Sequence, residues 1–411
     1  MKETKYKNTE IGRIPEEWET CTILSQSNKL VVAFVGTCEK YYTNKGEGVM
    51  MLRTGDLKER SIDYTNIKYI SYSFHNANKK SQLKKGDILI ARHGSNGHGV
   101  IYDKNDEANS LNFVIVHLID NEYLNSYLVY CLETNIVREQ IEAATAGSTQ
   151  KVINTKAIGE LIVPKPNILE QQSIASALTS IDNLISSLGK LIEKKKNIKQ
   201  GAMQQLLTGK IRLKEFTEPW VYRKISEIAT TSSGGTPSRS IPNYYYGDIK
   251  WFTTTELKDN YLYDSVEHIT REALNNSSAK MFSANTILMA MYGATIGKLG
   301  VLKEPSTTNQ ACCAIKCNDI VEIFLFYILL YNRKSIIEKG CGAGQPNISQ
   351  AIVNELSFLV PPCEKEQQAI ANILSKMDNE ITALEAKRAK YEAIKQGMMQ
   401  QLLTGKIRLI S

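Results

Sequence analysis

Two glycine-bearing turns, one in each half of the chain, carry side chains that could contact a nucleic acid. Residues 92–99 read Arg-His-Gly-Ser-Asn-Gly-His-Gly, and residues 292–298 read Tyr-Gly-Ala-Thr-Ile-Gly-Lys. Arginine and lysine suit the acceptors of guanine, asparagine and glutamine suit adenine, and hydroxyl groups and loop amides suit phosphate. A single polar loop residue can also be simply solvated, so the prediction concerns the loops as groups.

The same side-chain types recur at residues 148–151, 236–239 and 345–347 and after two strand-like runs. The candidate nucleic-acid-binding residues of the first half are Arg53, Thr54, Lys58, Arg92, His93, Asn96, His98, Thr149, Gln150 and Lys151. Those of the second half are Thr236, Ser238, Arg239, Thr254, Lys258, Tyr292, Lys298, Gln345 and Asn347. The net charge of +7, from 50 Lys and Arg against 43 Asp and Glu, is compatible with a polyanionic partner but does not require one.

A nuclease site is the main catalytic alternative. Asp248, Glu256 and Lys258 have the spacing of two acids and a lysine that could hold Mg²⁺ and polarise a water. The first half keeps Asp56 and a lysine but has Gly48 where the first acid would fall. Because acid-x-lysine patterns are common by chance, this interpretation is not favoured.

The sequence contains no complete site for ATP or for methyl transfer. Residues 293–298 are one residue short of a P-loop, and Leu299 follows where a metal-binding hydroxyl belongs. The run at 243–246, Asn-Tyr-Tyr-Tyr, lacks the prolines of an adenine-methyltransferase tetrapeptide, and no cofactor-binding glycine loop precedes it. We therefore expect a non-catalytic protein with no cofactor and no metal of its own.

The eight cysteines indicate neither a disulfide scaffold nor a metal site. Cys312, Cys313 and Cys317 cluster in an apolar run without a nearby histidine, so we expect small buried hydrophobic side chains. No apolar run approaches the ~20 residues that span a bilayer, and the N-terminal residues lack an apolar signal segment. These features predict a soluble, cytoplasmic protein.

The chain repeats itself with an offset of 196 residues. Residues 170–213 match residues 366–409 at 26 of 44 positions without a gap, and the last 14 positions are nearly identical. Two copies of one unit are the simplest explanation. Core packing requires similar volumes but not the same polar side chains. The repeated Gln204, Gln205 and Thr208 therefore suggest that one partner docks twice.

Each copy is predicted to end in a long helix. Apolar residues at 174, 178, 181, 185, 188 and 192 follow the spacing of a coiled-coil seam, which recurs from 370 to 384 and is interrupted at Arg388. Asn167 and Glu170 fit a capping box at the start, and Gly209 fits a stop. The two stripes are expected to pack on each other, antiparallel if a pseudo-twofold relates the copies.

The blocks before the helices are predicted to be β-rich, related and divergent in their loops. Residues 52–58 parallel 252–258, and residues 86–94 parallel 285–293, each as a strand that leads into a polar turn. Trp18 and Trp220 stand at matching positions. The scaffold is therefore expected to be shared, whereas the exposed loop chemistry differs.

This arrangement resembles the specificity subunit of a type I restriction-modification system. The motifs that carry the resemblance lie at 234–239, 249–251, 292–298 and 308–311 and in the two Gln-Gln-Leu-Leu-Thr-Gly-Lys-Ile tails. The first half departs from the pattern because it lacks the Gly-Gly-Thr-Pro run. The resemblance implies an α+β fold with two β-rich target-recognition domains separated by two long antiparallel coiled-coil helices in a pseudo-twofold repeat.

The implied domains are residues 1–163 and 215–360, with helical spacers at 164–214 and 361–411. Each recognition domain is expected to read half of an asymmetric, split double-stranded DNA target. The spacers are expected to bind two methyltransferase subunits, through which restriction subunits join. The proposed docking residues are Gln204, Gln205, Leu206, Leu207, Gln400, Gln401, Leu402 and Leu403.

A different class of function stays open beside this one. A coiled-coil adaptor or decoy that binds methyltransferase but no DNA would also tolerate divergent loops. Binding of DNA by the purified complex distinguishes the two possibilities.

Overall fold

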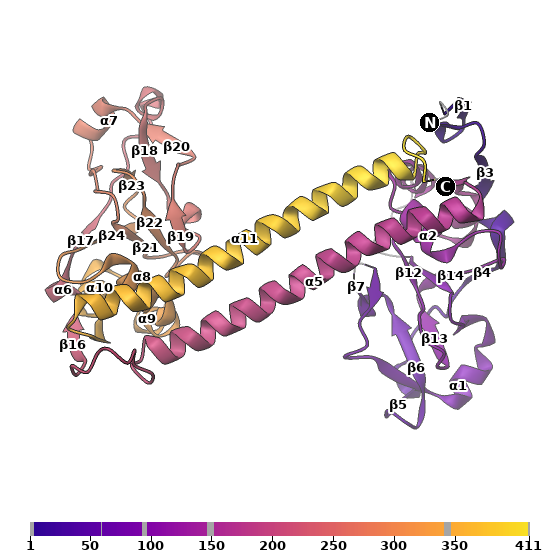
Figure 1. Cartoon of the computed structure of the whole chain (residues 1–411), viewed down its shortest axis with the longest axis horizontal. Helices are drawn as coiled ribbons and strands as arrows, with labels where there is room; N and C mark the ends of the chain where they lie inside the picture. The colour runs from indigo at the N-terminus through magenta and orange to yellow at the C-terminus, as the bar shows by residue number, and fades with distance from the viewer. Residues whose placement is uncertain (1–3, 59, 93–96, 146–151, 341–346, 410–411) are drawn as a thin grey trace. The chain divides into compact units, whose positions relative to one another are not determined.

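The structure is a computed structural model that describes residues 4–58, 60–92, 97–145, 152–340 and 347–409 (Figure 1). The fold mixes helices and sheets, as predicted. Its two longest elements are α5 (Ile168–Leu206) and α11 (Glu364–Leu402), each of 39 residues. Within the described ranges, no helix is long and apolar enough to cross a membrane.

Packing divides the chain into two compact units. Unit 1 comprises residues 1–189 and 387–411, and unit 2 comprises residues 190–386. Each unit contains one β-rich block, the first part of the helix that follows that block and the last part of the other long helix. The predicted boundaries at residues 163, 214 and 360 follow chain order, whereas these units follow packing.

Unit 1 is built on two sheets of different size. The five-stranded sheet has the order β10 (Gln82–Leu83), β13 (Ala108–Leu111), β6 (Gly48–Arg53), β9 (Lys68–Ser71) and β5 (Tyr42–Thr43). The four-stranded sheet has the order β12 (Gly99–Ile101), β11 (Ile88–Ala91), β14 (Phe113–Leu118) and β4 (Ser27–Val32). Three further pairs are β1 (Tyr6–Thr9) with β2 (Gly12–Pro15), β3 (Glu19–Thr22) with β15 (Ile162–Lys165), and β7 (Leu57–Lys58) with β8 (Ser61–Ile62). The short helices are α1 (Tyr72–Ala77), α2 (Asn125–Cys131), α3 (Asn135–Thr145) and α4 (Thr155–Glu160).

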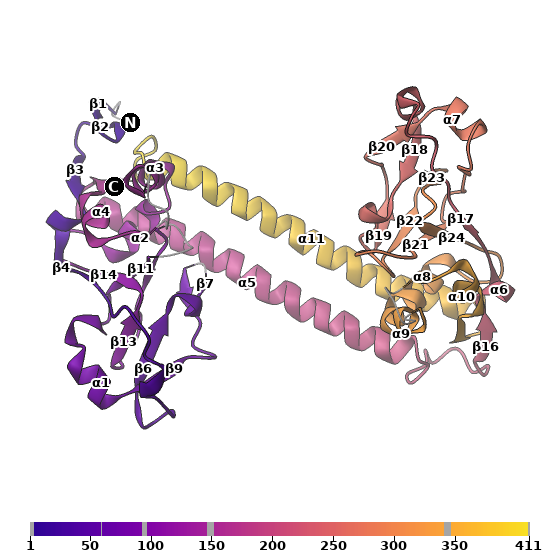
Figure 2. The same cartoon turned by 180° about the vertical axis from the view of Figure 1, so that it is seen from behind.

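Unit 2 has a related set of elements. Its five-stranded sheet has the order β17 (Ala229–Ser233), β24 (Cys312–Cys317), β21 (Ile287–Ala290), β22 (Leu299–Leu302) and β19 (Asn260–Leu262). The three-stranded sheet is β20 (Glu267–Ile269), β18 (Ile249–Phe252) and β23 (Thr307–Thr308), and β16 (Val221–Lys224) pairs with β25 (Ser357–Val360). The short helices are α6 (Ile225–Ile228), α7 (Arg271–Asn275), α8 (Glu322–Tyr331), α9 (Arg333–Lys339) and α10 (Gln350–Glu355), and both views show α8 beside the larger sheet (Figures 1 and 2).

One central strand in each unit serves two hydrophobic cores. In β11, Ile88 and Ile90 face the core that holds the helices, whereas Leu89 and Ala91 face a second core beneath the other sheet. In β21 the odd and even positions divide in the same way. Side chains alternate across a strand, so a fully apolar run is what a strand covered on both faces requires. These runs are the strands predicted before each glycine turn.

The prediction that the clustered cysteines are buried is confirmed for Cys312 and Cys313, whereas Cys317 is half-buried. Cys312 and Cys313 lie in β24 and are fully enclosed, one facing each core of unit 2. Burial raises the pKa of both thiols to about 12. They are neutral packing groups at physiological pH.

The ends of the long helices follow the predicted signals with one correction. The Glu170 backbone N–H donates to Asn167 Oδ1 (2.9 Å), so Asn167 caps α5. The Glu170 carboxylate does not return the bond expected of a capping box, because it accepts hydrogen bonds from other parts of unit 1. Gly209 and Gly405 have φ of +68°, and the N–H two residues beyond each closes the helix end.

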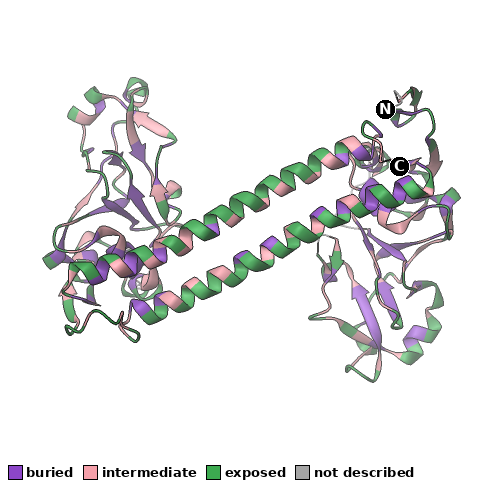
Figure 3. Ribbon diagram, in the orientation of Figure 1, coloured by how far each residue is buried: buried purple, intermediate pink, exposed green. Residues whose placement is uncertain are grey.

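The predicted seams are mostly buried, and the two helices run antiparallel within each unit. Ile185, Met377 and Leu384 are half-buried, the other seam residues are buried, and the opposite faces are exposed (Figure 3). In unit 2, Lys195 pairs with Glu380 (2.6 Å) and Lys199 with Asp378 (2.5 Å), so numbers rise on one helix as they fall on the other. In unit 1, Lys395 pairs with Asp182 (2.6 Å), which is the same contact under the repeat.

Candidate nucleic-acid interface

A short turn after β6 and its counterpart after β18 hold the first candidate residues. Arg53 donates to both carboxylate oxygens of Asp56 (2.7 and 3.1 Å), a bond that raises the pKa of the guanidinium. Thr54 is half-buried in the same turn. Lys58 is exposed and pairs with Asp63 (2.5 Å). The Arg53 side chain thus binds within its own turn, and the Lys58 side chain lies at the surface.

The counterpart turn in unit 2 explains the acid that suggested a nuclease. Glu256 accepts hydrogen bonds from the backbone N–H groups of Thr253 (2.7 Å) and Val266 (2.8 Å), one on each carboxylate oxygen. It therefore ties two loops together. Asp248 and Lys258 are exposed. In the described part of the chain, no group of three or more His, Cys, Asp or Glu residues is placed to hold a metal ion.

Thr254 is half-buried in the turn that Glu256 closes.

Near the end of each glycine turn, a basic side chain lies close to a carboxylate. His98 Nδ1 lies 3.7 Å from Glu133, and Lys298 Nζ lies 3.0 Å from Asp259. Gly97 and Gly297 have positive φ, and a Cβ there would meet α3 or α9. The backbone at these two glycines therefore lies close against the helical layer of each unit.

Six predicted residues cannot be placed. His93, Asn96, Thr149, Gln150, Lys151 and Gln345 lie outside the described residues. Arg92 is half-buried, and its Nε donates to the Ile153 carbonyl (3.4 Å). This hydrogen bond joins the end of β11 to the segment before α4.

Arg239 is the most elaborately held candidate in unit 2. It donates to both oxygens of Glu267 (2.5 and 2.7 Å), and its guanidinium lies over the rings of Tyr245 (4.0 Å) and Trp251 (5.1 Å). The bond to Glu267 raises the pKa of Arg239 and lowers that of the glutamate. An arginine fixed in this way at an exposed site is oriented before any partner arrives.

The remaining candidates of unit 2 lie in two places. Thr236 donates to the exposed Gln310, which joins the 236–239 loop to the 308–311 motif. Ser238 is exposed on the same loop. Tyr292 is exposed and forms a backbone bridge with Asn347, so those two loops also meet.

Gln310 was missed as a candidate. The signal was available, because it lies in one of the motifs on which the family resemblance rests.

The docking prediction is corrected for its four leucines. Leu206 and Leu207 are buried in the main core of unit 2, and Leu402 and Leu403 in that of unit 1. An enclosed side chain presents no apolar surface to a partner, so the leucines are repeated because they fill equivalent cores. The paired glutamines are different: Gln204, Gln205 and Gln400 are exposed, and Gln401 is half-buried.

A buried Trp–Glu–Arg cluster recurs in each unit. In unit 1, the Trp18 indole N–H (2.9 Å) and the Arg408 guanidinium (2.6 and 2.8 Å) donate to Glu170. The unit 2 cluster consists of Trp220, Arg212 and Glu366, with the same donors at 3.3, 2.7 and 2.8 Å. Each cluster fastens the tail that follows one long helix to the beginning of the other. We call these the unit 1 and unit 2 locks.

Known proteins share these features. A family model described as the type I restriction modification DNA specificity domain matches residues 15–200 and 217–396. A Methanocaldococcus jannaschii protein, provisionally named as the MjaX specificity subunit of a type I restriction enzyme, is 28% identical over 99% of this chain and 98% of its own length. The Escherichia coli EcoR124I/EcoR124II specificity subunit is 25% identical over 66% of this chain and 70% of its own.

A solved structure shares the fold. The S subunit of a type I restriction-modification system from M. genitalium matches with a TM-score of 0.62 at 18% identity, over 94% of this chain and 96% of that one. The family model covers both copies of the repeat and most of the chain. The chain therefore belongs to the family of type I restriction-modification specificity subunits.

Proposed function

We propose that this specificity subunit reads a split, asymmetric double-stranded DNA target, one half through the polar loops of each unit. The observation that supports the proposal is that the two units share their buried locks but differ in their exposed loops. The locks and one Lys–Asp contact between the long helices recur in both units, whereas the residues at the exposed turns differ. A common frame with different loops suits two different half-sites.

The subunit is proposed to have no catalytic role. Glu256, the acid of the alternative nuclease site, is engaged by two backbone N–H groups, which supports this view. Methyl transfer and cleavage would then come from partners, in the cytoplasm. Mg²⁺-dependent cleavage of DNA by the pure chain, lost in Glu256→Ala, would contradict the proposal.

The long helices are proposed to act as an antiparallel coiled-coil spacer in a pseudo-twofold arrangement. Two methyltransferase subunits would dock on it, one near Gln204 and Gln205 and one near Gln400 and Gln401, and restriction subunits would join through them. The exposure of Gln204, Gln205 and Gln400 supports docking there.

Methylation mapping tests the proposal directly. Methylated adenines are compared genome-wide with and without this gene. A two-part motif that disappears with the gene is the expected result. An unchanged methylome, together with no gel shift of target DNA by the purified complex, would favour the DNA-independent adaptor.

A further inference from the structure

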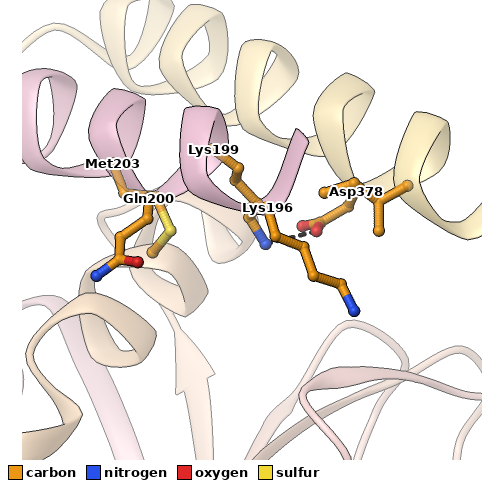
Figure 4. A pocket seen from close by; sticks show the side chains of 6 residues that line it. Lys196, Lys199, Gln200, Met203 and Asp378 are labelled. Atoms are coloured by element: carbon orange, nitrogen blue, oxygen red, sulfur yellow. Dashed lines mark hydrogen bonds and ion pairs between the residues drawn. The ribbon is translucent and has the colours of Figure 1, made fainter. Parts of the chain in front are cut away.

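Unit 2 contains a cavity of about 270 Å³ where α5 and α11 lie side by side. The residues that line it are Lys196, Lys199, Gln200, Met203, Asp378 and Ile381 (Figure 4). Lys199 and Asp378 point toward one another from the two helices (2.5 Å), and the Tyr327 hydroxyl donates to the same carboxylate (2.7 Å). The cavity therefore combines two lysines, a carboxylate, an amide, a thioether and apolar surface.

The same six positions recur in unit 1 under the offset of 196 residues. Five keep their residue type, as Lys395, Gln396, Met399, Asp182 and Ile185, and only Lys196 changes, to Glu392. The equivalent position in unit 1 therefore indicates which side chain a site with these residues can bind.

In unit 1 an arginine side chain occupies that place. The Arg60 guanidinium lies 3.8 Å over the Tyr130 ring, its Nη1 is 3.3 Å from Asp182, and its Nη2 is 3.9 Å from the Met399 sulfur. Nη2 also pairs with Glu133, and only 17% of the Arg60 side chain is exposed. A planar cation gains from an aromatic face and a carboxylate when both are shielded from water.

Unit 2 repeats the aromatic ring, carboxylate and sulfur of this receptor, but Lys199 Nζ lies 5.4 Å over the Tyr327 ring, so an incoming guanidinium has to displace it. Tyr327 and Asp378 repeat the hydroxyl–carboxylate bond of unit 1, and Met203 repeats the sulfur. In the described part of the chain, the partners of Asp378 are Tyr327 and Lys199, and neither is an arginine. When the alignment of residues 52–58 with 252–258 is extended by two residues, the position that matches Arg60 holds Asn260.

Both lysines that line the cavity are paired with carboxylates. Lys199 is paired with Asp378, and Lys196 is paired with Glu385 (2.7 Å), so these four groups sum to zero. Three residues after the conserved tyrosine, unit 1 has Glu133 and unit 2 has Leu330. A guanidinium entering unit 2 therefore finds one shared carboxylate, and it binds tightly only when the rest of a docked chain holds it in place.

We propose that this cavity, the unit 2 arginine site, receives an arginine side chain from another protein chain that docks on the helices of unit 2. The proposal rests on the proposed docking function only for the identity of that chain. It makes the two units unequal as docking places, because unit 1 fills its own site with Arg60.

The test is a titration of the full-length protein labelled at its methionine methyl groups. The Met203 and Met399 signals are assigned with Met203→Leu and Met399→Leu. N-acetyl-arginine amide at millimolar concentrations should shift the Met203 signal saturably and leave Met399 unmoved. The citrulline analogue, which has the same shape without the charge, should bind about tenfold more weakly. Because the readout needs no partner, its failure is separate from failure of docking.

Two variants sharpen the result. Asp378→Asn should weaken the Met203 response about tenfold, whereas Asp182→Asn, its matched control in unit 1, should leave that response unchanged. Arg60→Gln should empty the unit 1 site, so that arginine amide then shifts Met399 as well. If a variant fails to fold, the Met203 shift of the wild-type protein alone decides whether the proposal holds. No saturable Met203 shift, an equal response to citrulline, or a response to N-acetyl-glutamate amide instead would overturn the proposal.

Discussion

At the scale of single residues, one buried carboxylate in each unit joins the start of a long helix to a tryptophan and to an arginine of the opposite tail. Glu170 and Glu366 have no exposed side-chain surface, and each meets an indole N–H and a bidentate arginine. A buried carboxylate is tolerated only with such compensation, and removing its cation leaves an unpaired charge in the core. The locks are therefore sensitive points of both units.

Replacing the arginine of a lock should destabilise its unit. Arg408→Ala leaves Glu170 buried and unpaired, and we expect a loss of about 3 kcal/mol in the free energy of unfolding of unit 1. Arg212→Ala in unit 2 is the matched comparison, with a smaller loss because Arg212 is more exposed than Arg408 (26% against 7%). Chemical denaturation measures both, and Arg408→Ala combined with Glu170→Gln should recover part of the loss. Equal stability of Arg408→Ala and wild type would refute the role of the lock.

Arg239 gives the residue-level prediction for reading. Arg239→Ala should change or weaken recognition at one half-site only, by about 1–3 kcal/mol if the side chain reads a base. If it contacts phosphate, binding should weaken for all sequences and its salt dependence should fall. Arg223→Ala, which removes a half-buried arginine paired with Glu227 and Asp319, is the control. A base-specific change at both half-sites would contradict one domain reading one half.

At the scale of elements, local signals predicted more than distant ones. The seams, the Asn167 cap and the fully apolar strands β11 and β21 were predictable because their patterns are local and periodic. The locks were not, because the partners of Glu170 are 152 and 238 positions away. The leucines at the end of each helix were misinterpreted because identical sequence was taken as a shared surface.

The glutamines of the helix ends carry the docking prediction at this scale. Gln204→Arg with Gln205→Arg should remove one of two methyltransferase subunits, because two exposed amides are replaced by bulky charges without loss of a core contact. Native mass spectrometry of the complex measures the number of partners. Leu206→Asp is the contrasting change, since a buried carboxylate should unfold unit 2 itself. Two bound partners with the glutamine variant would exclude docking at this place.

At the scale of the whole molecule, each copy supplies the parts of both units. The first copy ends in Arg212, which serves the unit 2 lock, and the second ends in Arg408, which serves the unit 1 lock. A fragment ending near Leu213 keeps an apolar seam and a free lock arginine. Two such fragments can exchange tails, with Arg212 of each meeting Glu170 of the other.

The fragment of residues 1–213 is therefore expected to dimerise and to be active with its methyltransferase. Its target should be an inverted repeat of the first half-site, with nearly the parental spacer, because both readers are identical. Sedimentation of the fragment and methylation mapping measure the two properties. A monomeric, inactive fragment would argue against the exchange, and an asymmetric target would refute the symmetry.

The second fragment, from about residue 217 to 411, should dimerise more weakly. Glu385 pairs with Lys196 in the whole chain, but under the repeat it would face Glu392 of an identical fragment, twice in the dimer. Arg388 also interrupts its seam, where it lies beside Gly189. Glu392→Lys should strengthen association of this fragment, and added salt should do the same for the unchanged fragment. Equal association of the two fragments would contradict the role given to these charges.

The split composition of unit 1 has a consequence for the order in which the protein is made. Unit 2 is one continuous stretch, whereas unit 1 needs residues 387–411, which leave the ribosome after all of unit 2. Until Arg408 emerges, Glu170 has no cation, and the start of α5 lacks the buried Met399, Leu402 and Leu403. A nascent chain therefore completes its second unit before its first. A chain that stops early carries an unfinished first unit, open to proteases and chaperones.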